Sequence, residues 1–257
     1  MGQGHSHGVD ALYVQGQTRI HKLAAHLKIV AAFSFVLLVV LTPTTWFLAF
    51  GVYALIVIGL LIYISVPWNI VRTRLLLEIP FVLFALFLPF FGIGPKIDFL
   101  GLSLSEAGLL AGWNILAKAT LGVLTTVVLS STTKPKDLLI GLEKLRVPTL
   151  LVQIASFMIR YTVVVAEELK RMSVARESRC FEAKGPKSWA VLAKGLGALF
   201  IRSYERGERV HLAMLSRGYS GRIPLTQTVT VSAKDWAVAL TLPVSAGIVL
   251  LFGGFWY

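Results

Sequence analysis

Long apolar stretches are the feature that most limits how this chain can fold. Polar or charged segments separate five such stretches, at residues 23–41, 46–64, 75–93, 105–130 and 236–257. A transmembrane helix needs about 20 predominantly apolar residues, and each stretch is close to that length. Hydrophobic residues make up 56% of the whole chain, above the level of about 45–50% in soluble domains. The sequence therefore predicts an all-α polytopic membrane protein with about five transmembrane helices.

The distribution of lysine and arginine predicts how these helices are oriented. Three basic residues lie at the start of the first stretch, two lie between the second and third, and 18 lie from Lys134 to Lys234. Only Lys96 falls in a loop of the opposite side, and Lys118 lies within a span. Since cytoplasmic loops carry the excess of basic residues, we expect the N-terminus and residues 134–234 to face the cytoplasm. This orientation predicts a multi-pass protein of the cell membrane.

The same pattern divides the chain into four parts. They are a Gly/His-rich tail at 1–22, transmembrane helices at 23–131, a cytosolic region with two long amphipathic helices at 132–233 and a final transmembrane helix at 234–257. The cations of the third part are mixed with eight acidic residues from Asp137 to Glu208, and no nucleic-acid-binding motif accompanies them, which argues against nucleic acid as a partner. Anionic lipid is a sufficient partner for a basic face beside a membrane.

Two long helices are predicted within the third part, after a short amphipathic helix that ends near Leu145. Apolar residues recur at the helical period after Pro148 and again after Gly185-Pro186, where Ser188 is expected to cap the second helix. Gly218 is expected to end that helix. Small residues at 195, 197, 203 and 207 predict that the two helices cross. Whether 148–166 lies in the membrane or along it stays open, so five or six spans are possible.

The two predicted helices end in nearly matching heptapeptides, offset by 38 residues. They are Ala175-Arg-Glu-Ser-Arg-Cys-Phe181 and Ala213-Met-Leu-Ser-Arg-Gly-Tyr219, and the upstream pairs Glu167/Glu205 and Arg171/Arg209 recur as well. Each end presents an arginine whose guanidinium can bind carboxylates or carbonyls of a partner. One such arginine would be explained by the helix dipole alone. Two in matched contexts predict a docking surface.

At these residues the chain resembles the transmembrane (T) component of energy-coupling factor transporters, and it is most similar to the cobalt-type (CbiQ-like) subgroup. Members of that family end each coupling helix in an Ala-Arg-Gly-like motif, which corresponds here to Ser178-Arg179-Cys180 and Ser216-Arg217-Gly218. The resemblance covers nearly the whole chain, including an opening Met-Gly-x-Gly-His-x-His. Cys180 stands where glycine is usual. Because cysteine tolerates a positive φ poorly, the motif does not fix the backbone after Arg179.

The resemblance implies a non-catalytic subunit that joins two cytosolic ABC-type ATPases to a metal-binding membrane subunit for substrate specificity. ATP would be bound by the ATPases, Co²⁺ or Ni²⁺ would be transported, and no cofactor would be held by this chain. The implied ATPase contacts are the two tripeptides, supported by Ala175, Arg176 and Ala213. His5 and His7 are weak candidates for metal ligands, since imidazole suits cobalt and nickel.

Two other classes of function fit parts of the sequence. A membrane-embedded enzyme could use Glu78, Glu106 or Lys118 as an acid or base, because ionisable residues within spans are often functional. Lys118 and Asn114 share a helix face, and we favour a structural contact with Glu78 or Glu106 as the explanation for them. An ATP-independent carrier or channel is the second alternative. The sequence contains no phosphate-binding loop Gly-x-x-x-x-Gly-Lys-Ser/Thr and no His-Glu-x-x-His motif.

Overall fold

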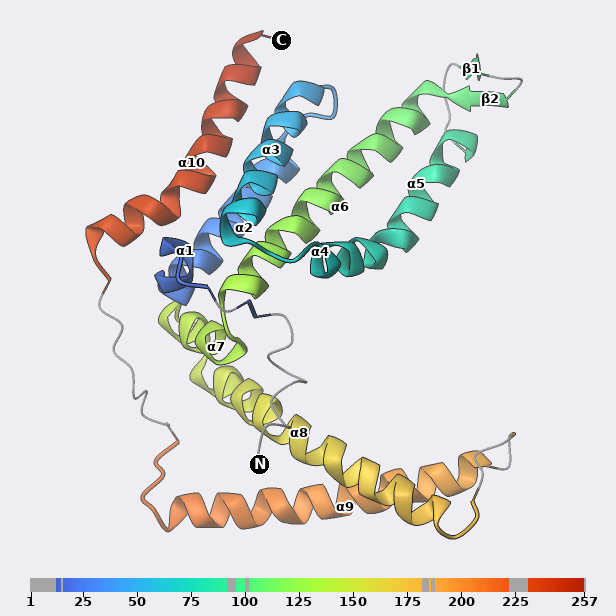
Figure 1. The fold of residues 1–257 in the computed structure, drawn as a ribbon, viewed down its shortest axis with the longest axis vertical. Helices are drawn as coiled ribbons and strands as arrows, with labels where there is room; N and C mark the ends of the chain where they lie inside the picture. The colour runs from blue at the N-terminus through green and yellow to red at the C-terminus, as the bar shows by residue number, and fades with distance from the viewer. Residues whose placement is uncertain are drawn as a thin grey trace. The chain divides into compact units, whose positions relative to one another are not determined.

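The computed structural model describes residues 13–14, 16–91, 96–99, 102–181, 185, 188–221 and 231–256, most of which are helical (Figure 1). The chain forms two compact units. The first, here called the bundle unit, contains Asp10–Leu145 and Val229–Tyr257. The second, here called the two-helix unit, contains Arg146–Thr228. The predicted all-α polytopic fold is confirmed.

The bundle unit contains the apolar helices that the sequence predicted as spans. Its described elements are α1 (Arg19–Lys22), α2 (Ala25–Leu41), α3 (Phe47–Ile64), α4 (Trp68–Leu75), a 3₁₀ turn η1 (Leu76–Glu78), α5 (Ile79–Phe91), β1 (Lys96–Phe99), β2 (Leu102–Ser105), α6 (Glu106–Thr132), α7 (Pro135–Lys144) and α10 (Ala233–Trp256). The two-helix unit contains α8 (Thr149–Glu177) and α9 (Ser188–Leu215).

The core of the bundle unit lies where α2, α3, α6 and α10 meet. Phe35 and Tyr53 are fully buried there, with their rings edge to face at 5.9 Å. The Tyr53 hydroxyl donates a hydrogen bond to the carbonyl of Ala246 (3.3 Å) and lies 3.2 Å from the hydroxyl of Thr42. A buried hydroxyl needs such partners because no water is available to it. These contacts join α2, α3 and α10 within one layer.

The outer surface of the apolar helices of the bundle unit is strongly apolar. Its exposed side chains include Phe33, Leu48, Leu55, Ile62 and Phe91. A soluble protein rarely exposes so much apolar area, whereas a bilayer solvates it. Among the described residues, five helices are long and apolar enough to cross a membrane: Phe47–Ile64, Trp68–Phe91, Glu106–Thr132, Thr149–Glu177 and Ala233–Gly253.

This set of five differs in one member from the predicted set. Ala25–Leu41, within the first predicted span, is an apolar helix of 17 residues, at the lower end of the range of about 17–25 residues for a spanning helix. Thr149–Glu177 takes its place by length and composition, although the sequence left the stretch 148–166 open. The third predicted span, 75–93, starts earlier in the structure, because the corresponding apolar stretch is Trp68–Phe91 and consists of α4, η1 and α5.

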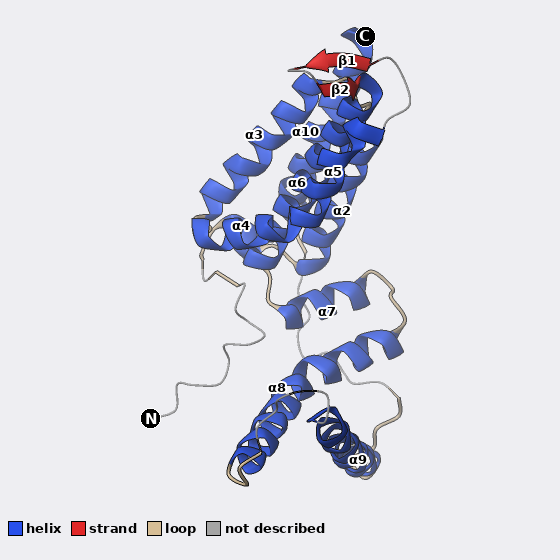
Figure 2. Cartoon of the chain, turned by 90° about the vertical axis from the view of Figure 1, so that its right-hand side faces the viewer, coloured by secondary structure: helices blue, strands red, loops and turns tan. Residues whose placement is uncertain are grey.

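Close packing of α5 against α6 depends on two glycines of α6. A Cβ placed on Gly108 would lie 2.6 Å from the carbonyl oxygen of Leu88, and one on Gly112 would lie 2.8 Å from that of Ala85. No larger side chain fits at these distances, so glycine lets the two backbones approach. Between the two helices, β1 and β2 form an antiparallel hairpin that pairs Lys96 with Ser105 (Figure 2). The sequence predicted no strand there.

The segment before α2 is fastened to the end of α6. The Val14 amide donates to the Ser131 carbonyl (3.0 Å), and the Lys28 ammonium donates to the carbonyls of Thr132 (2.8 Å) and His21 (3.1 Å). In the tautomer protonated on Nε2, His21 donates to the Val14 carbonyl at 3.1 Å. Burial lowers the pKa of the His21 imidazole, which favours this neutral form. These contacts fix the position where α6 leads into α7.

Helix α7 packs against α2 in the bundle unit. A Cβ on Gly141 would lie 2.9 Å from the backbone nitrogen of His26, so the two helices touch through their backbones. The predicted amphipathic helix before Leu145 is thereby confirmed. Beyond it, Arg146 adopts a left-handed conformation with φ +63°, and Pro148 precedes the first residue of α8. The turn at Arg146 coincides with the boundary between the two units.

Candidate functional site

The first candidate docking end, here called the α8 tip, comprises residues 178–181 after the last turn of α8. Arg179 lies one residue before Cys180, which adopts the left-handed conformation with φ +57°. The Phe181 amide donates to the carbonyl of Arg176 at 3.2 Å, and the Cys180 amide donates to that of Glu177 at 2.9 Å. Such a pair of bonds around a left-handed residue closes a helix C-terminus and satisfies its last carbonyls.

The second docking end, here called the α9 tip, comprises residues 216–219 and has the same backbone. Arg217 precedes Gly218, whose φ is +80°. The Tyr219 amide donates to the carbonyl of Met214 at 3.0 Å, and the Gly218 amide donates to that of Leu215 at 3.0 Å. The expectation that Gly218 ends the second helix is confirmed. Position by position, the hydrogen bonds of this tip repeat those of the α8 tip at an offset of 38 residues.

The cysteine of the first motif does not change the path of the backbone. Cys180 occupies the left-handed conformation that its glycine counterpart occupies, so the backbone after Arg179 follows the same path as that after Arg217. A side chain in this conformation costs roughly 1–2 kcal/mol relative to glycine. The local hydrogen bonds of the α8 tip therefore carry a cost that the α9 tip does not carry.

The surroundings of both arginines indicate a surface that can accept a partner. Arg179 and Arg217 are exposed, and neither forms an ion pair with any carboxylate in the described part of the chain. Ser178 and Ser216 bond backward to their own helices, to the carbonyls of Val174 (2.9 Å) and Ala213 (3.0 Å). The serines therefore stiffen the last turns, while the guanidinium groups keep their donors available.

The charges upstream of the tips also repeat in space. Glu167 lies 3.6 Å from Arg171 on α8, and Glu205 lies 3.9 Å from Arg209 on α9. Each pair is separated by four residues and is largely exposed, so each contributes only about 0.3–0.5 kcal/mol. These arginines are occupied along their own helices. The internal repeat thus extends over three helical turns and covers more than the tripeptide motifs.

Helices α8 and α9 run in opposite directions and contact one another. Near the end of α8, Arg176 and Met172 pack over Gly195, where a Cβ would lie 2.9 Å from a guanidinium nitrogen. Two turns further along α9, the guanidinium of Arg202 donates to the carboxylate of Glu168 at 2.6 Å. The predicted contact between the helices is present, but a Cβ placed on Gly197 or Gly207 would meet nothing within 4 Å outside its own helix, so these two glycines are not at the contact. Arg176 is therefore part of the contact between the helices.

The opposite directions of the helices separate the two tips. Figure 1 shows α8 and α9 running in opposite directions. Near the α8 tip, Arg176 lies over Gly195 in the first half of α9, and at the α9 tip Tyr219 bonds to Gln153 near the start of α8. Since α9 has 28 residues and a helix rises about 1.5 Å per residue, the tips are about 40 Å apart. Ser188 begins α9, but its hydroxyl donates to the carbonyl of Gly185 (2.7 Å) and does not accept from a helix amide as predicted.

A contact that the sequence did not predict fastens the α9 tip. The Tyr219 hydroxyl donates to Oε1 of Gln153 at 2.7 Å, and Nε2 of Gln153 donates to the carbonyl of Gly221 at 3.1 Å. We call these two bonds the Gln153 brace. Gln153 is a polar residue in the apolar first half of α8, and that contrast was the only signal of its role. At the α8 tip, the repeat places Phe181 at the position of Tyr219, without a hydroxyl.

Two of the ionisable residues that the sequence singled out within spans, Lys118 and Glu78, have structural partners. Lys118 donates to the carbonyl of Val40 at 2.8 Å, and its expected contact with Glu78 or Glu106 is not formed. Glu78 is buried and accepts from the Thr120 hydroxyl at 2.9 Å. Lys118 and Glu78 therefore form separate contacts, one from α6 to Val40 and one from η1 to Thr120 of α6. His5 and His7 lie outside the described residues.

Comparison with known proteins gives a consistent family. A family model with the description "Cobalt transport protein" (CbiQ) matches residues 16–228. The chain is 28% identical over 252 residues to the energy-coupling factor transporter transmembrane protein EcfT of Bacillus subtilis, a match that covers 92% of this chain and 94% of that protein. It is also 28% identical over 156 residues to the cobalt transport protein CbiQ of Rhodobacter capsulatus, covering 61% and 62% of the two chains.

An archaeal relative matches a shorter region. An uncharacterized protein of Methanocaldococcus jannaschii is 30% identical over 152 residues, which cover 59% of this chain and 52% of the relative. The chain therefore spans about half the length of that protein, whereas it spans nearly the full length of the Bacillus subtilis protein.

Proposed function

The chain belongs to the CbiQ family of cobalt transport proteins, and from that premise we propose that it is the transmembrane coupling subunit of an ATP-driven metal uptake transporter. It is a multi-pass protein of the cell membrane, and its family is one of transport proteins and not of enzymes. In the proposed complex, the coupling region at residues 132–233 is cytosolic and transmits motion from ATPases to a membrane subunit that binds the metal ion.

The observation that carries this proposal is the matched pair of tips. Each long helix ends in a serine and an exposed arginine followed by a left-handed residue, with the same capping hydrogen bonds. A single cationic helix end needs only the helix dipole as an explanation. Two ends with the same backbone, displayed about 40 Å apart as estimated from helix rise, suit two similar partners or one partner with two-fold symmetry.

We propose that each tip docks into one of two ABC-type ATPases. Arg179 and Arg217 would form charge-assisted hydrogen bonds with carboxylates or helix-end carbonyls of the ATPases. Ser178, Cys180, Ser216 and Gly218 would hold the last turn in place, with Ala175 and Ala213 allowing close approach. When ATP binding closes the ATPase pair, the distance or angle between the two docking points changes. The stiff helices convert that change into motion of the membrane-embedded part.

The cargo in this proposal is Co²⁺ or Ni²⁺, which a separate membrane subunit binds and releases toward the cytoplasm. ATP is bound and hydrolysed on the ATPases, and this chain holds no cofactor. The names of two relatives support the assignment, since one is an energy-coupling factor transporter protein and the other a cobalt transport protein. His5 and His7 remain proposed weak ligands for the same ions, through imidazole nitrogen.

The test is purification of the full-length tagged chain from its native membrane, followed by reconstitution in liposomes. We expect two ATPase chains and one metal-binding membrane protein to co-elute with it. Uptake of radioactive cobalt should then require ATP on the side of the ATPases. Transport by the purified chain alone without ATP would instead indicate a carrier or channel, and would overturn the proposal.

A further inference from the structure

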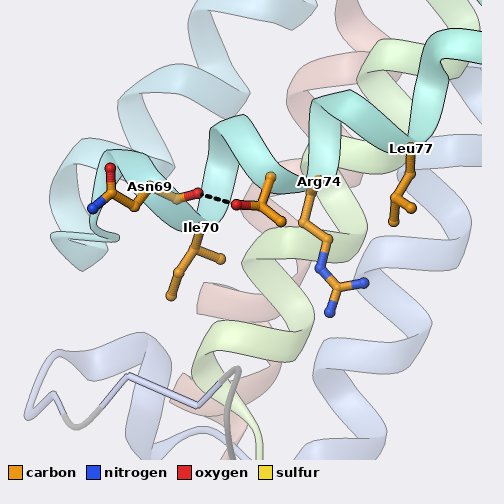
Figure 3. Close-up of a pocket in the computed structure, with 5 residues that line it drawn as sticks. Asn69, Ile70, Arg74 and Leu77 are labelled. Carbon is orange, nitrogen blue, oxygen red and sulfur yellow. Dashed lines mark hydrogen bonds between the residues drawn. The ribbon is translucent and has the colours of Figure 1, made fainter.

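We propose that the face of α4 lined by Asn69, Ile70, Thr73, Arg74 and Leu77 is a binding site for one anionic phospholipid. These residues border a shallow groove of about 400 Å³ (Figure 3). They recur at helical spacing along α4 and η1, so they form one stripe. In Figure 3 the side chains of Ile70, Arg74 and Leu77 project from the same side of the helix.

The position of α4 in the chain places this stripe at the membrane surface. Helix α3 ends at Ile64, and α4 begins the next stretch that is long and apolar enough to cross a membrane, Trp68–Phe91, in which η1 separates α4 from α5. The short connection after α3 and the start of this stretch, including α4, must therefore lie near one bilayer interface. Trp68, at the start of α4, exposes 71% of its surface, as interfacial tryptophans do. The distribution of basic residues predicts that this interface is the cytoplasmic one.

The charges of α4 match an anionic headgroup. Arg72 and Arg74 are the basic residues of this helix, and neither guanidinium has a carboxylate partner among the residues that the structure describes. Only Arg74 lines the groove. The hydroxyl of Thr73 is already used, because it donates to the carbonyl of Asn69 at 2.8 Å. A phosphate would therefore be bound chiefly by the fork of Arg74, which suits phosphate oxygens.

The apolar residues beside Arg74 identify the occupant as a lipid rather than a soluble anion. Leu77 exposes 63% of its surface one turn beyond Arg74, and Ile70 lies one turn before it and packs on the bundle core. A phospholipid carries a phosphate that can bind Arg74 and an acyl chain that can pack against the adjacent Ile70 and Leu77. The cytoplasmic leaflet supplies anionic lipids, which favour basic residues close to the membrane.

The experiment measures retained phosphatidylglycerol by native mass spectrometry. Full-length protein is reconstituted with an equal mixture of phosphatidylglycerol and phosphatidylcholine and then released in mild detergent. We expect the wild-type protein to retain phosphatidylglycerol preferentially. Arg74→Gln should weaken its retention about fivefold, the effect of removing one basic contact near a membrane surface. Soluble glycerol phosphate should fail to compete, because it lacks the acyl chain.

Arg72→Gln is the matched control, since it removes the same charge from the same helix outside the groove. We expect it to leave phosphatidylglycerol retention near the wild-type value. Equal losses in Arg72→Gln and Arg74→Gln would mean diffuse attraction and would overturn the site. Full competition by glycerol phosphate would mean a site for a soluble anion. Unchanged lipid retention in Arg74→Gln together with loss of a protein partner would assign the stripe to that partner.

Arg74→Lys keeps the positive charge without the guanidinium fork. Its retention of phosphatidylglycerol should fall between that of the wild-type protein and that of Arg74→Gln.

Discussion

The α8 tip and the α9 tip have the same local structure and different support. Both place an exposed arginine before a left-handed residue, and both close the helix with the same two hydrogen bonds. The α9 tip is in addition joined to the start of α8 through the Gln153 brace. The α8 tip has a cysteine in the strained conformation and a phenylalanine where the brace needs a hydroxyl. Local sequence thus makes the ends alike, and distant contacts make them unequal.

The difference suggests how force would pass through the two ends. A load on the α9 tip reaches the start of α8 directly, over two hydrogen bonds. A load on the α8 tip must pass along α8 itself or across the contacts at Gly195 and Glu168. We therefore expect equal importance of the two tips for docking, and unequal sensitivity to the loss of supporting contacts.

Charge reversal at the tips should have the largest effect. Either Arg179→Glu or Arg217→Glu should weaken ATPase binding by on the order of 3 kcal/mol, or about a hundredfold, because it sets an acid against a partner site built for a cation. Co-purification of the ATPases and ATP-driven cobalt uptake measure this loss. Lys170→Glu, an exposed charge reversal on α8 more than two helical turns before Arg179, is the control. A large loss from only one of the two arginines would break their proposed equivalence.

Removal of the Gln153 brace should have the next largest effect, and only at the α9 tip. Tyr219→Phe removes the half-buried bond of the brace, and Gln153→Leu removes that bond and the exposed bond to Gly221, at about 1 kcal/mol for each bond. Amide hydrogen exchange at residues 216–221 should accelerate while that at 178–181 stays constant. Tyr204→Phe removes an exposed hydroxyl from the same helix and serves as the control. Equal acceleration at both tips would contradict the asymmetry.

The strained cysteine predicts a gain in stability at the α8 tip. Cys180→Gly should slow amide exchange at residues 178–181, corresponding to about 1 kcal/mol, because glycine adopts a positive φ without steric cost. Cys180→Ala removes the thiol and keeps the Cβ, so it should bring no such gain. If the two variants behave alike, the conformation of Cys180 is not the source of the difference.

The ion pair between the two helices should have the smallest effect. Arg202 and Glu168 are 2.6 Å apart, but the Arg202 side chain is 59% exposed, and solvent screening limits such a pair to less than about 1 kcal/mol. A double-mutant cycle with Glu168→Gln and Arg202→Gln, read from thermal unfolding, gives the coupling. Coupling well above that level would mean that this pair, rather than the Gln153 brace, sets the stiffness of the two-helix unit.

The sequence was sufficient for most features that depend on local pattern, although it predicted neither the β1–β2 hairpin nor the hydrogen bond that Ser188 forms. Apolar runs located the helices of the bundle, and the heptapeptide repeat located both tips, because capping depends on a few neighbouring residues. It was not sufficient for contacts across large separations. The Gln153 brace joins residues 66 apart, and α4 lies in the short basic segment between the second and third predicted spans, where no helix was predicted. Gly197 and Gly207 fit the spacing of a crossing motif, yet only Gly195 faces α8. The periodicity of small residues predicts which face of a helix they share, but it does not predict which helix packs against that face.

Cys180 is the single cysteine of the chain and is exposed beside Arg179, so its maleimide labelling rate tests the central claim most directly. The second tip is measured in the same way with a Cys180→Ser/Ser216→Cys variant. If both tips dock into ATPases, labelling at each position is rapid in the isolated chain and strongly slowed in the assembled complex. Labelling at either tip that is equally rapid with and without the ATPases would contradict the account.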